Sequence, residues 1–393
     1  MLHRTTLALR RRLAGALLAT ATAAGCGGSS PETHVPPAPG PDEACLVRAG
    51  DPTRASELVV ALASPADSVL LARQRTEPPI RLDCLGRPRP ALASAWSRDS
   101  TGKTWTLTFA DAGAVAASWR TRREAAEALR FAGVESVVPV DERRIVVTFR
   151  QVHDSVPPLF ADVTLGLTRD STAGPALRAL RVADARDALD RGADLVRSAD
   201  PAVLDYAARR PGALVTPLPW DRTYVLILPA MSPGLGPIPG PDTAAFRAAL
   251  AGDAVRTEAR AAVGPFWWGT AQCDRPPGSR AGPYTSSAVV YSRGDQVAGA
   301  LAARLVAMAD APDLVARGVE PAQLAAALRA GTDRAYVVGI ERRALVPCRE
   351  MAGWPPGADA LALIDTRARL VARAGVPPLE IEFDGAFRPA RTP

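Results

Sequence analysis

The sequence predicts a mixed α/β fold with more than one domain, and three observations lead to this prediction. The chain has 393 residues, enough for two to three domains of about 150 residues each. Strand and hairpin patterns fill much of the first half, whereas strands alternate with helices in the second half. The apolar fraction of 47% can fill real cores, which excludes a disordered chain.

The N-terminus has the pattern of an export signal. Arg4 and Arg10–Arg12 precede the apolar run Leu13–Ala24, and small residues lead to Cys26. A basic segment, an apolar run and small residues before a cut site are typical of a signal peptide, here residues 1–25. The apolar run is shorter than the roughly 20 residues that a membrane-spanning helix needs.

The segment Ala23–Cys26 resembles a lipobox, in which the cysteine thiol is acylated and becomes the first residue of the mature protein. Leucine is usual where Ala23 stands, so the alternative is a plain secretory signal with an incidental cysteine. Residues 26–44 are rich in Gly, Ser and Pro without a helical or strand period, which predicts a tether.

The net charge gives little reason to expect a charged partner. Loss of residues 1–25 removes four arginines and no acid, so the formal charge falls from +6 to +2. A mature charge this small does not favour a nucleic-acid partner or a polybasic contact with a membrane.

Four cysteines remain after Cys26, namely Cys45, Cys84, Cys273 and Cys348. An even number in an exported chain is typical of disulfides. Three pairings are possible, and proximity along the chain favours Cys45–Cys84 and Cys273–Cys348; buried free cysteines are the alternative. The spacings do not fit a zinc site, because no CxxC and no nearby Cys/His cluster exists. No metal or cofactor is therefore expected.

The first half is predicted to begin with the buried strand Glu57–Leu62. Within Pro90–Phe109, a short apolar anchor and a polar turn precede the strand Thr104–Phe109, in which apolar residues alternate with threonines. Ala114–Phe131 has apolar residues at helical spacing opposite arginines and glutamates, which predicts one amphipathic helix. A hairpin follows, with arms Val134–Val140 and Arg144–Phe149.

The second half begins with a helix-prone stretch from Thr168 to about Asp190 and a helix over Asp200–Arg210, capped by Asp200 or Ser198. Further strands are predicted at Leu214–Thr216, Thr223–Leu228, Ser287–Tyr291 and Ala335–Ile340, and further helices at Asp242–Val263, Gln296–Ala309 and Pro321–Arg329. This alternation predicts an α/β lobe with some parallel strand pairing.

Several of these segments resemble, in the same order, motifs of family 5 solute-binding proteins, the extracytoplasmic peptide, nickel and oligosaccharide receptors of ABC importers. Pro90–Phe109 (PALASAWSRDSTGKTWTLTF) is similar to the family's P-x-LA-x-SW…G-K-x-(W/Y)-T segment. Other similar segments are Val115–Arg120, Val134–Phe149, Gly192–Leu195 with Asp200–Pro201, Pro219–Tyr224, Phe246–Leu250, Val289–Gln296, Leu324–Val338, and Ala360–Arg369 with Phe383–Gly385.

The resemblance implies a two-lobed periplasmic-binding-protein-like fold (type II), with mixed sheets flanked by helices and a cleft between the lobes. Lobe I is expected to comprise residues 45–225 and 346–393, and lobe II residues 226–345. Two departures from the family stand out: a loop collapsed to Ala110–Gly113, and a nearly absent helical segment between Ile340 and Ala360. They imply a smaller or more open pocket.

The function implied by the resemblance is binding, without covalent chemistry. The protein is expected to be a monomeric lipoprotein in the periplasm or at the cell surface, anchored to the membrane by its N-terminal acyl chains. It would capture a peptide or similar polar solute and present it to an ABC permease and its ATPase.

Aromatic side chains with a polar tip suit peptides and sugars, so Trp220, Trp267, Trp268 and Trp354 are predicted ligand contacts. Arg222 and Asp274 are predicted to bind a ligand carboxylate and ammonium group. The alternatives are that the tryptophans pack in cores and that the charged residues form surface ion pairs.

Two other functions remain open. A family member that has lost delivery would act as a sensor or scaffold. A periplasmic hydrolase has less support, because only His34 and His153 lie outside the leader and no GxSxG motif occurs. His153–Ser155 brings three catalytic residue types together, but neighbours along a loop do not meet productively. No enzymatic activity is therefore expected.

Overall fold

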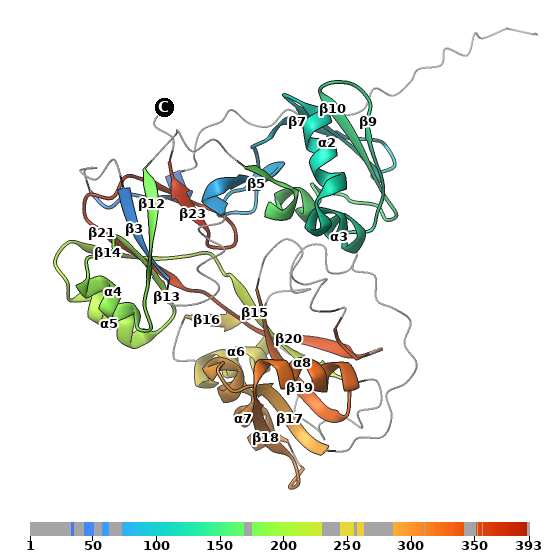
Figure 1. Ribbon diagram of the computed structural model, residues 1–393. Helices are drawn as coiled ribbons and strands as arrows, with labels where there is room; N and C mark the ends of the chain where they lie inside the picture. The colour runs from blue at the N-terminus through green and yellow to red at the C-terminus, as the bar shows by residue number, and fades with distance from the viewer. Residues whose placement is uncertain are drawn as a thin grey trace, which may run out of the picture.

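A computed structural model describes residues 33–34, 43–50, 57–62, 73–168, 175–229, 244–254, 258–262, 286–309, 311–341, 351, 353–355 and 357–390. In these residues, three large sheets flanked by helices dominate (Figure 1). We call them the hairpin sheet, the mixed five-stranded sheet and the six-stranded sheet. Each sheet packs its own apolar cores. The predicted mixed α/β class is confirmed.

The hairpin sheet is antiparallel, with the order β1-β7-β8-β10-β9. Its strands are β1 (Thr33–His34), β7 (Ala93–Arg98), β8 (Thr104–Phe109), β9 (Val134–Pro139) and β10 (Arg144–Phe149). Trp105, Leu107 and Phe109 are buried, whereas the threonines between them are half-buried. The predicted alternation and both predicted hairpin arms are confirmed.

The expected single helix over Ala114–Phe131 is wrong, because the chain forms two helices. α2 (Ala112–Thr121) and α3 (Arg123–Phe131) flank Arg122, which is extended with φ −87° and ψ 118°. The Arg122 guanidinium donates a hydrogen bond to the carbonyl of Gly166 at 2.5 Å. Both helices bury apolar residues against the same core, so the helical pattern continues across the break.

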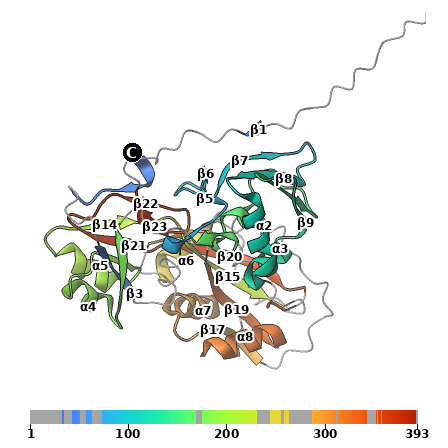
Figure 2. The ribbon, with the colours of Figure 1, turned by 45° about the horizontal axis from the view of Figure 1, so that its top comes forward.

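The tether residues Thr33–His34 form a strand, although no strand was predicted there. β1 pairs antiparallel with β7, with Thr33 opposite Ser97 and His34 opposite Trp96 (Figure 2). Two residues are too short to show a strand period. The pairing supplies a neighbour to one edge of the hairpin sheet.

The mixed five-stranded sheet has the order β12-β3-β13-β21-β14, in which β3 pairs parallel with both β12 and β13. Its strands are β3 (Glu57–Leu62), β12 (Ala176–Arg181), β13 (Leu195–Ser198), β14 (Ala213–Pro217) and β21 (Arg369–Arg373). The helices α4 (Ala185–Asp190) and α5 (Pro201–Ala208) pack on it. The Asp200 carboxylate accepts from the N–H of Ala202 at 2.9 Å, so the predicted cap is confirmed.

The helix-prone prediction for the stretch from Thr168 to Asp190 is wrong over β12. All six residues of β12 pair in register with β3. The Ala-Leu-Arg repeat of β12 suits a helix, but tertiary pairing decides the outcome here.

The six-stranded sheet has the order β16-β20-β15-β19-β17-β18, and β17 is parallel to β18 and β19. The parallel pairing predicted for this part is therefore confirmed. Its strands are β15 (Arg222–Leu228), β16 (Ala259–Ala261), β17 (Ser286–Ser292), β18 (Val315–Val319), β19 (Asp333–Glu341) and β20 (Asp359–Thr366).

Helices cover both faces of the six-stranded sheet (Figure 1). α6 (Ala244–Ala254) and α7 (Gln296–Met308) pack on one face, and α8 (Pro321–Ala330) packs on the other. The expected helix Asp242–Val263 is wrong at its end, because Ala259–Ala261 pairs with β20 as a strand. The strands β15 and β20 belong to this sheet over their whole length, whereas the predicted boundary after residue 225 falls inside β15.

Short strands complete the described chain. They are β2 (Leu46–Val47), β4 (Thr76–Glu77), β5 (Ile80–Leu82), β6 (Pro88–Pro90), β11 (Leu167–Thr168), β22 (Leu379–Ile381) and β23 (Phe387–Pro389). β22 pairs with both β2 and β23, so the C-terminal strands lie beside the N-terminal part of the described body. None of the helices in the described ranges is both long and apolar enough to span a membrane.

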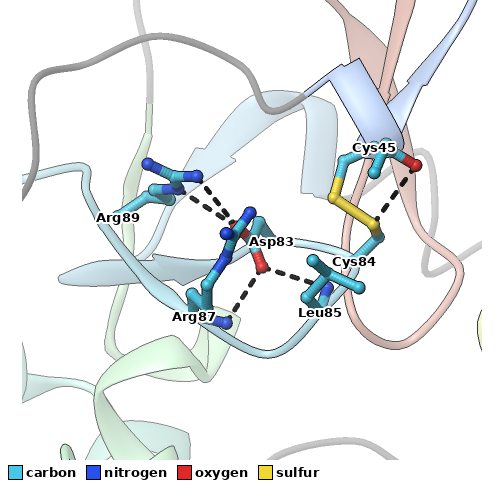
Figure 3. The surroundings of a disulfide bond; sticks show 7 residues. Cys45, Asp83, Cys84, Leu85, Arg87 and Arg89 are labelled. Atoms are coloured by element: carbon cyan, nitrogen blue, oxygen red, sulfur yellow. Dashed lines mark hydrogen bonds and ion pairs between the residues drawn. A yellow bond between two sulfur atoms is a disulfide. The ribbon is translucent and has the colours of Figure 1, made fainter.

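A disulfide joins Cys45 to Cys84, with 5.4 Å between their Cα atoms (Figure 3). This pairing was the one favoured from sequence, and it is confirmed. Next to it, the buried Asp83 carboxylate accepts hydrogen bonds from the N–H groups of Leu85 and Arg87 and pairs with the guanidinium groups of Arg87 and Arg89. The turn that carries Cys84 is thereby held by side chains as well as by the disulfide. Cys273 and Cys348 lie outside the described residues.

Candidate functional site

Two chain connections link the mixed five-stranded sheet to the six-stranded sheet. Residues 218–221 lead from β14 to β15, and residues 367–368 lead from β20 back to β21. They lie side by side, because the N–H of Leu218 donates to the carbonyl of Ala368 at 3.0 Å and the N–H of Asp221 to that of Thr366 at 3.2 Å. We call these two connections the hinge.

Trp220 lies in the hinge and contacts two arginines. The guanidinium carbon of Arg260 is 4.6 Å from its ring centroid, and that of Arg367 is 4.5 Å away. Arg260 belongs to β16 and also pairs with Asp365 at 3.0 Å. Cation–π contacts of this kind stabilise by about 0.5–1 kcal/mol each at exposed sites. The half-buried indole ring is thus held by the protein itself.

Ion pairs connect the two sheets around this tryptophan. Glu258, next to β16 in the six-stranded sheet, pairs with Arg367 of the hinge and with Arg369 of β21. On the other connection, Asp221 pairs with Arg197 of β13. The Glu258 pairs join the six-stranded sheet to the hinge and to β21, and the Asp221 pair joins the hinge to β13. A rotation at the hinge therefore has to move or break these ion pairs.

A second charged group lies one step from the hinge, at the first residue of β15. The Arg222 guanidinium is 3.3 Å from Glu341 of β19 and 3.7 Å from Asp295, which precedes α7. Asp295 also accepts from the phenol of Tyr224 at 3.0 Å and from the N–H of Ala298 at 3.0 Å. We call Arg222, Tyr224, Asp295 and Glu341 the polar cluster.

Gly339 makes room for the polar cluster. A Cβ atom at this position would lie 2.8 Å from the ring of Tyr224 and 3.2 Å from both Arg222 and Asp295. Burial raises the pKa of Tyr224, and the nearby Asp295 carboxylate raises it further. The phenol therefore remains a donor at neutral pH. Within the polar cluster, one guanidinium lies between two carboxylates.

Two predicted ligand contacts, Trp220 and Arg222, are neighbours in sequence, but their side chains have different partners. Trp220 contacts Arg260 and Arg367, whereas Arg222 pairs with Asp295 and Glu341. Trp354 lies instead in a core of the six-stranded sheet, with its side chain 8% exposed. Trp267, Trp268, Asp274 and the lipidation residue Cys26 lie outside the described residues.

Sequence reasoning missed four residues of this region, namely Arg260, Asp295, Glu341 and Arg367. Asp295 had a usable signal, because it stands directly before the predicted helix from Gln296 and has the residue type of an N-cap. Arg260, Glu341 and Arg367 had no signal in the sequence, because only the register of the strands brings them beside Trp220 and Arg222.

His153 has no catalytic setting. Its ring is buried against Phe149, with 4.4 Å between the ring centroids, and burial lowers the pKa of the imidazole. The neighbouring acid Asp154 points into solvent, with its side chain 96% exposed. No group of His, Cys, Asp and Glu side chains suited to a metal ion occurs in the described parts of the chain.

Comparisons with known proteins give structural matches only. No protein-family model and no curated protein matches the sequence. The pheromone receptor PrgZ superposes with a TM-score of 0.58 at 9% identity, over 85% of this chain and 98% of that chain. NikA from Brucella suis, in complex with Fe(III)-EDTA, gives 0.53 at 14% identity, over 85% and 100%. The murein tripeptide binding protein MppA of Escherichia coli gives 0.52 at 12% identity, over 86% and 99%.

Identities this low carry the fold alone. The matched chains are covered almost completely, so the likeness extends beyond one sheet or one lobe. The chain therefore has the two-lobed α/β fold of type II periplasmic binding proteins, as its sequence predicted.

Proposed function

We propose that this protein is an exported solute-binding protein of the family 5 type, which captures a peptide or similar polar solute for an ABC importer. The observation that carries the proposal is the hinge, in which two adjacent connections join two sheets within a binding-protein fold. Such connections allow lobes to close around a ligand. Two structural neighbours, the pheromone receptor PrgZ and the murein tripeptide binding protein MppA, bind peptides, which supports a peptide as ligand.

The polar cluster is the proposed charged part of the ligand site. Its two carboxylates, Asp295 and Glu341, suit a ligand group with positive charge, such as an ammonium group. Arg222 already pairs with two carboxylates, so its proposed binding of a ligand carboxylate requires an exchange of partners. Trp220, Trp267, Trp268 and Asp274 remain proposed contacts. Trp354 is also a proposed contact but the least supported one, because this residue is buried in a core.

The remaining assignments belong to the same proposal. The lobe boundaries expected from sequence, 45–225 with 346–393 and 226–345, would move to the hinge, because β15 and β20 belong to the six-stranded sheet. Lobe I would then comprise residues 45–221 and 367–393, and lobe II residues 222–366. The partners would be a permease and its ATPase. Acylated Cys26 would hold the mature chain at a membrane, facing the periplasm or the cell exterior. In cells fed an alkyne fatty acid, the wild-type protein should take up label, and Cys26→Ser should lose both the label and membrane retention.

The central experiment is native mass spectrometry of the mature chain, residues 26–393 with Cys26→Ser so that β1 is retained, purified gently and then stripped by unfolding and refolding. We expect a bound peptide or polar solute that leaves on stripping and returns on addition. Asp295→Asn combined with Glu341→Gln should weaken binding of this ligand. Asp359→Asn is the matched control, because Asp359 is exposed and lies at the end of β20 away from the hinge.

A chain that runs at its bare mass and whose melting temperature no peptide pool raises would contradict the proposal. That outcome would favour the sensor or scaffold function instead.

A further inference from the structure

A cavity of about 210 Å³ lies at the opposite end of β21 from the hinge. It forms where α4 leads into β13 and where α5 leads into β14, next to the last residue of β21. β21 begins beside the hinge at Arg369 and ends at the cavity with Arg373. The cavity is therefore separate from the proposed ligand site.

Its walls combine apolar and charged side chains. Leu189, Pro211 and Val371 supply apolar surface, and Asp190, Arg210 and Arg373 supply charge. One water molecule takes up about 30 Å³ in the liquid, so the cavity has room for several waters or for one small organic molecule.

Two of the three charged groups neutralise each other. The Asp190 carboxylate accepts from the Tyr206 phenol at 2.5 Å and pairs with Arg210, whose guanidinium also lies over the Tyr206 ring. The Tyr206 hydrogen bond and the Arg210 pair lower the pKa of Asp190, so this carboxylate is ionised at neutral pH. These contacts fix Asp190 and Arg210 in place.

Arg373 is different, because no carboxylate of the described residues lies within ion-pair distance of it. Its guanidinium rests above the turn at Gly192, where a Cβ atom would lie 3.4 Å from Nη1. Gly192 has φ +78°, a conformation that side chains other than glycine rarely adopt. Arg373 is exposed to solvent, so a ligand can reach its guanidinium from outside the cavity.

The charged lining of the cavity carries one net positive charge, and the group that supplies it is Arg373. A guanidinium can bind a carboxylate through two parallel hydrogen bonds. The adjacent apolar wall suits a short hydrocarbon chain and disfavours a fully hydrated ion.

We propose that this cavity is a second ligand site, for a small organic carboxylate held by Arg373, with its hydrocarbon part against Leu189, Pro211 and Val371. The site goes beyond the proposed transport function and does not depend on it. A carboxylate bound there would stabilise the mixed five-stranded sheet without touching the hinge.

The test uses the mature chain, residues 26–393 with Cys26→Ser to prevent acylation, and butyrate as the probe. Binding is measured by saturation-transfer NMR, with butylamine and inorganic phosphate for comparison. We expect millimolar or tighter binding of butyrate, weaker binding of phosphate and none of butylamine. Arg373→Gln should raise the dissociation constant for butyrate about tenfold or more, and Arg373→Lys should raise it less, because the lysine retains the charge without the paired donors. The exposed neighbour Arg209→Gln is the matched control and should change it little.

Unchanged butyrate binding in Arg373→Gln would overturn the proposal, as would phosphate binding as tightly as butyrate or no butyrate binding at millimolar concentration. Circular dichroism of each variant shows whether it is folded. If Arg373→Gln does not fold, the test rests on Arg373→Lys, in which butyrate binding as tight as in the wild-type protein would overturn the proposal. Loss of peptide binding at the hinge leaves this result unaffected, so the two proposals fail separately.

Discussion

The guanidinium of Arg367 lies over the indole ring of Trp220, 4.5 Å from its centroid, and also pairs with Glu258. The two residues are 147 positions apart in sequence and belong to different connections of the hinge. Backbone hydrogen bonds already join these connections. The side chains add a second layer of contacts, so the hinge is a packed element with a defined geometry.

Replacing Trp220 separates its hinge role from its proposed ligand role. Trp220→Ala removes two cation–π contacts and part of the packing, so we expect a loss of about 1–3 kcal/mol in the free energy of unfolding. Trp220→Phe keeps a ring and should lose less. Urea unfolding measures both. Unchanged stability together with lost ligand binding would show that Trp220 acts only as a ligand contact.

Gly339→Ala tests the polar cluster through its packing. The added Cβ would come within 2.8 Å of the Tyr224 ring, so this ring has to move, and Arg222 and Asp295, each 3.2 Å away, have to shift slightly. We expect a loss of about 1–3 kcal/mol in stability together with weaker ligand binding, measured by thermal unfolding with and without ligand.

Gly252→Ala is the control for that substitution. Gly252 lies within α6, and a Cβ there meets nothing within 4 Å. Alanine should stabilise this helix by about 0.5–1 kcal/mol. If Gly339→Ala behaves like this control, the space around Gly339 has no role in the cluster.

The disulfide between Cys45 and Cys84 should contribute strongly to stability. It closes a loop with a sequence separation of 39, and disulfides of this kind typically contribute about 2–4 kcal/mol. Cys45→Ser with Cys84→Ser should lower the free energy of unfolding by that amount. Mass mapping of unreduced tryptic peptides should recover the two cysteines in one linked pair. The same map tests the predicted Cys273–Cys348 pair, whose absence would point to free thiols there.

Acid should destabilise the protein through Glu382. This carboxylate is buried and pairs with Arg73 at 2.5 Å and Arg388 at 2.6 Å. Burial alone would raise the pKa of Glu382, but Arg388 and Arg73 outweigh burial and lower it below its ordinary value of 4.5. The stabilisation is therefore fully present above the pKa of Glu382 in the unfolded chain. It decreases as the pH falls below that value and is lost once the pH has passed through the lower pKa of the folded protein.

Urea unfolding between pH 7 and pH 3 measures this effect. Glu382→Gln leaves two buried arginines without this partner and should cost about 3–5 kcal/mol at pH 7, with a flatter acid slope. Glu57→Gln breaks an exposed pair with Arg178 and should change neither quantity appreciably. An unchanged slope in the Glu382 variant would place the acid sensitivity elsewhere.

Local patterns predicted the hairpin sheet well. In Thr104–Phe109 the alternation of apolar residues and threonines matches the observed burial, because one face of an antiparallel strand packs on the core. The capped helix at Pro201–Ala208 was also visible, because its Asp200 cap is a local signal. Features set within a few residues are accessible to this kind of reasoning.

Features set by distant pairing were not accessible. The segment Ala176–Arg181 has helix-forming residues, and only its register with β3 makes it a strand. Similarly, the register of β15 with β19 brings Arg222 beside Glu341. No spacing in the sequence connects these residues, so the polar cluster and the partners of Trp220 appear only in the folded chain.

The pairing of Thr33–His34 with β7 has a consequence for how the protein would sit at a membrane. Seven peptide links separate Cys26 from Thr33, and an extended chain spans at most about 3.6 Å per residue. With Cys26 acylated as proposed, the first residue of β1 stays within roughly 25 Å of the lipid surface. The free part of the tether is thus shorter than residues 26–44, because it ends at β1. It keeps the β1 edge of the hairpin sheet near the membrane. The hairpin sheet would therefore stay closer to the lipid than the rest of the body, and a permease would have to bind within that short reach of the membrane.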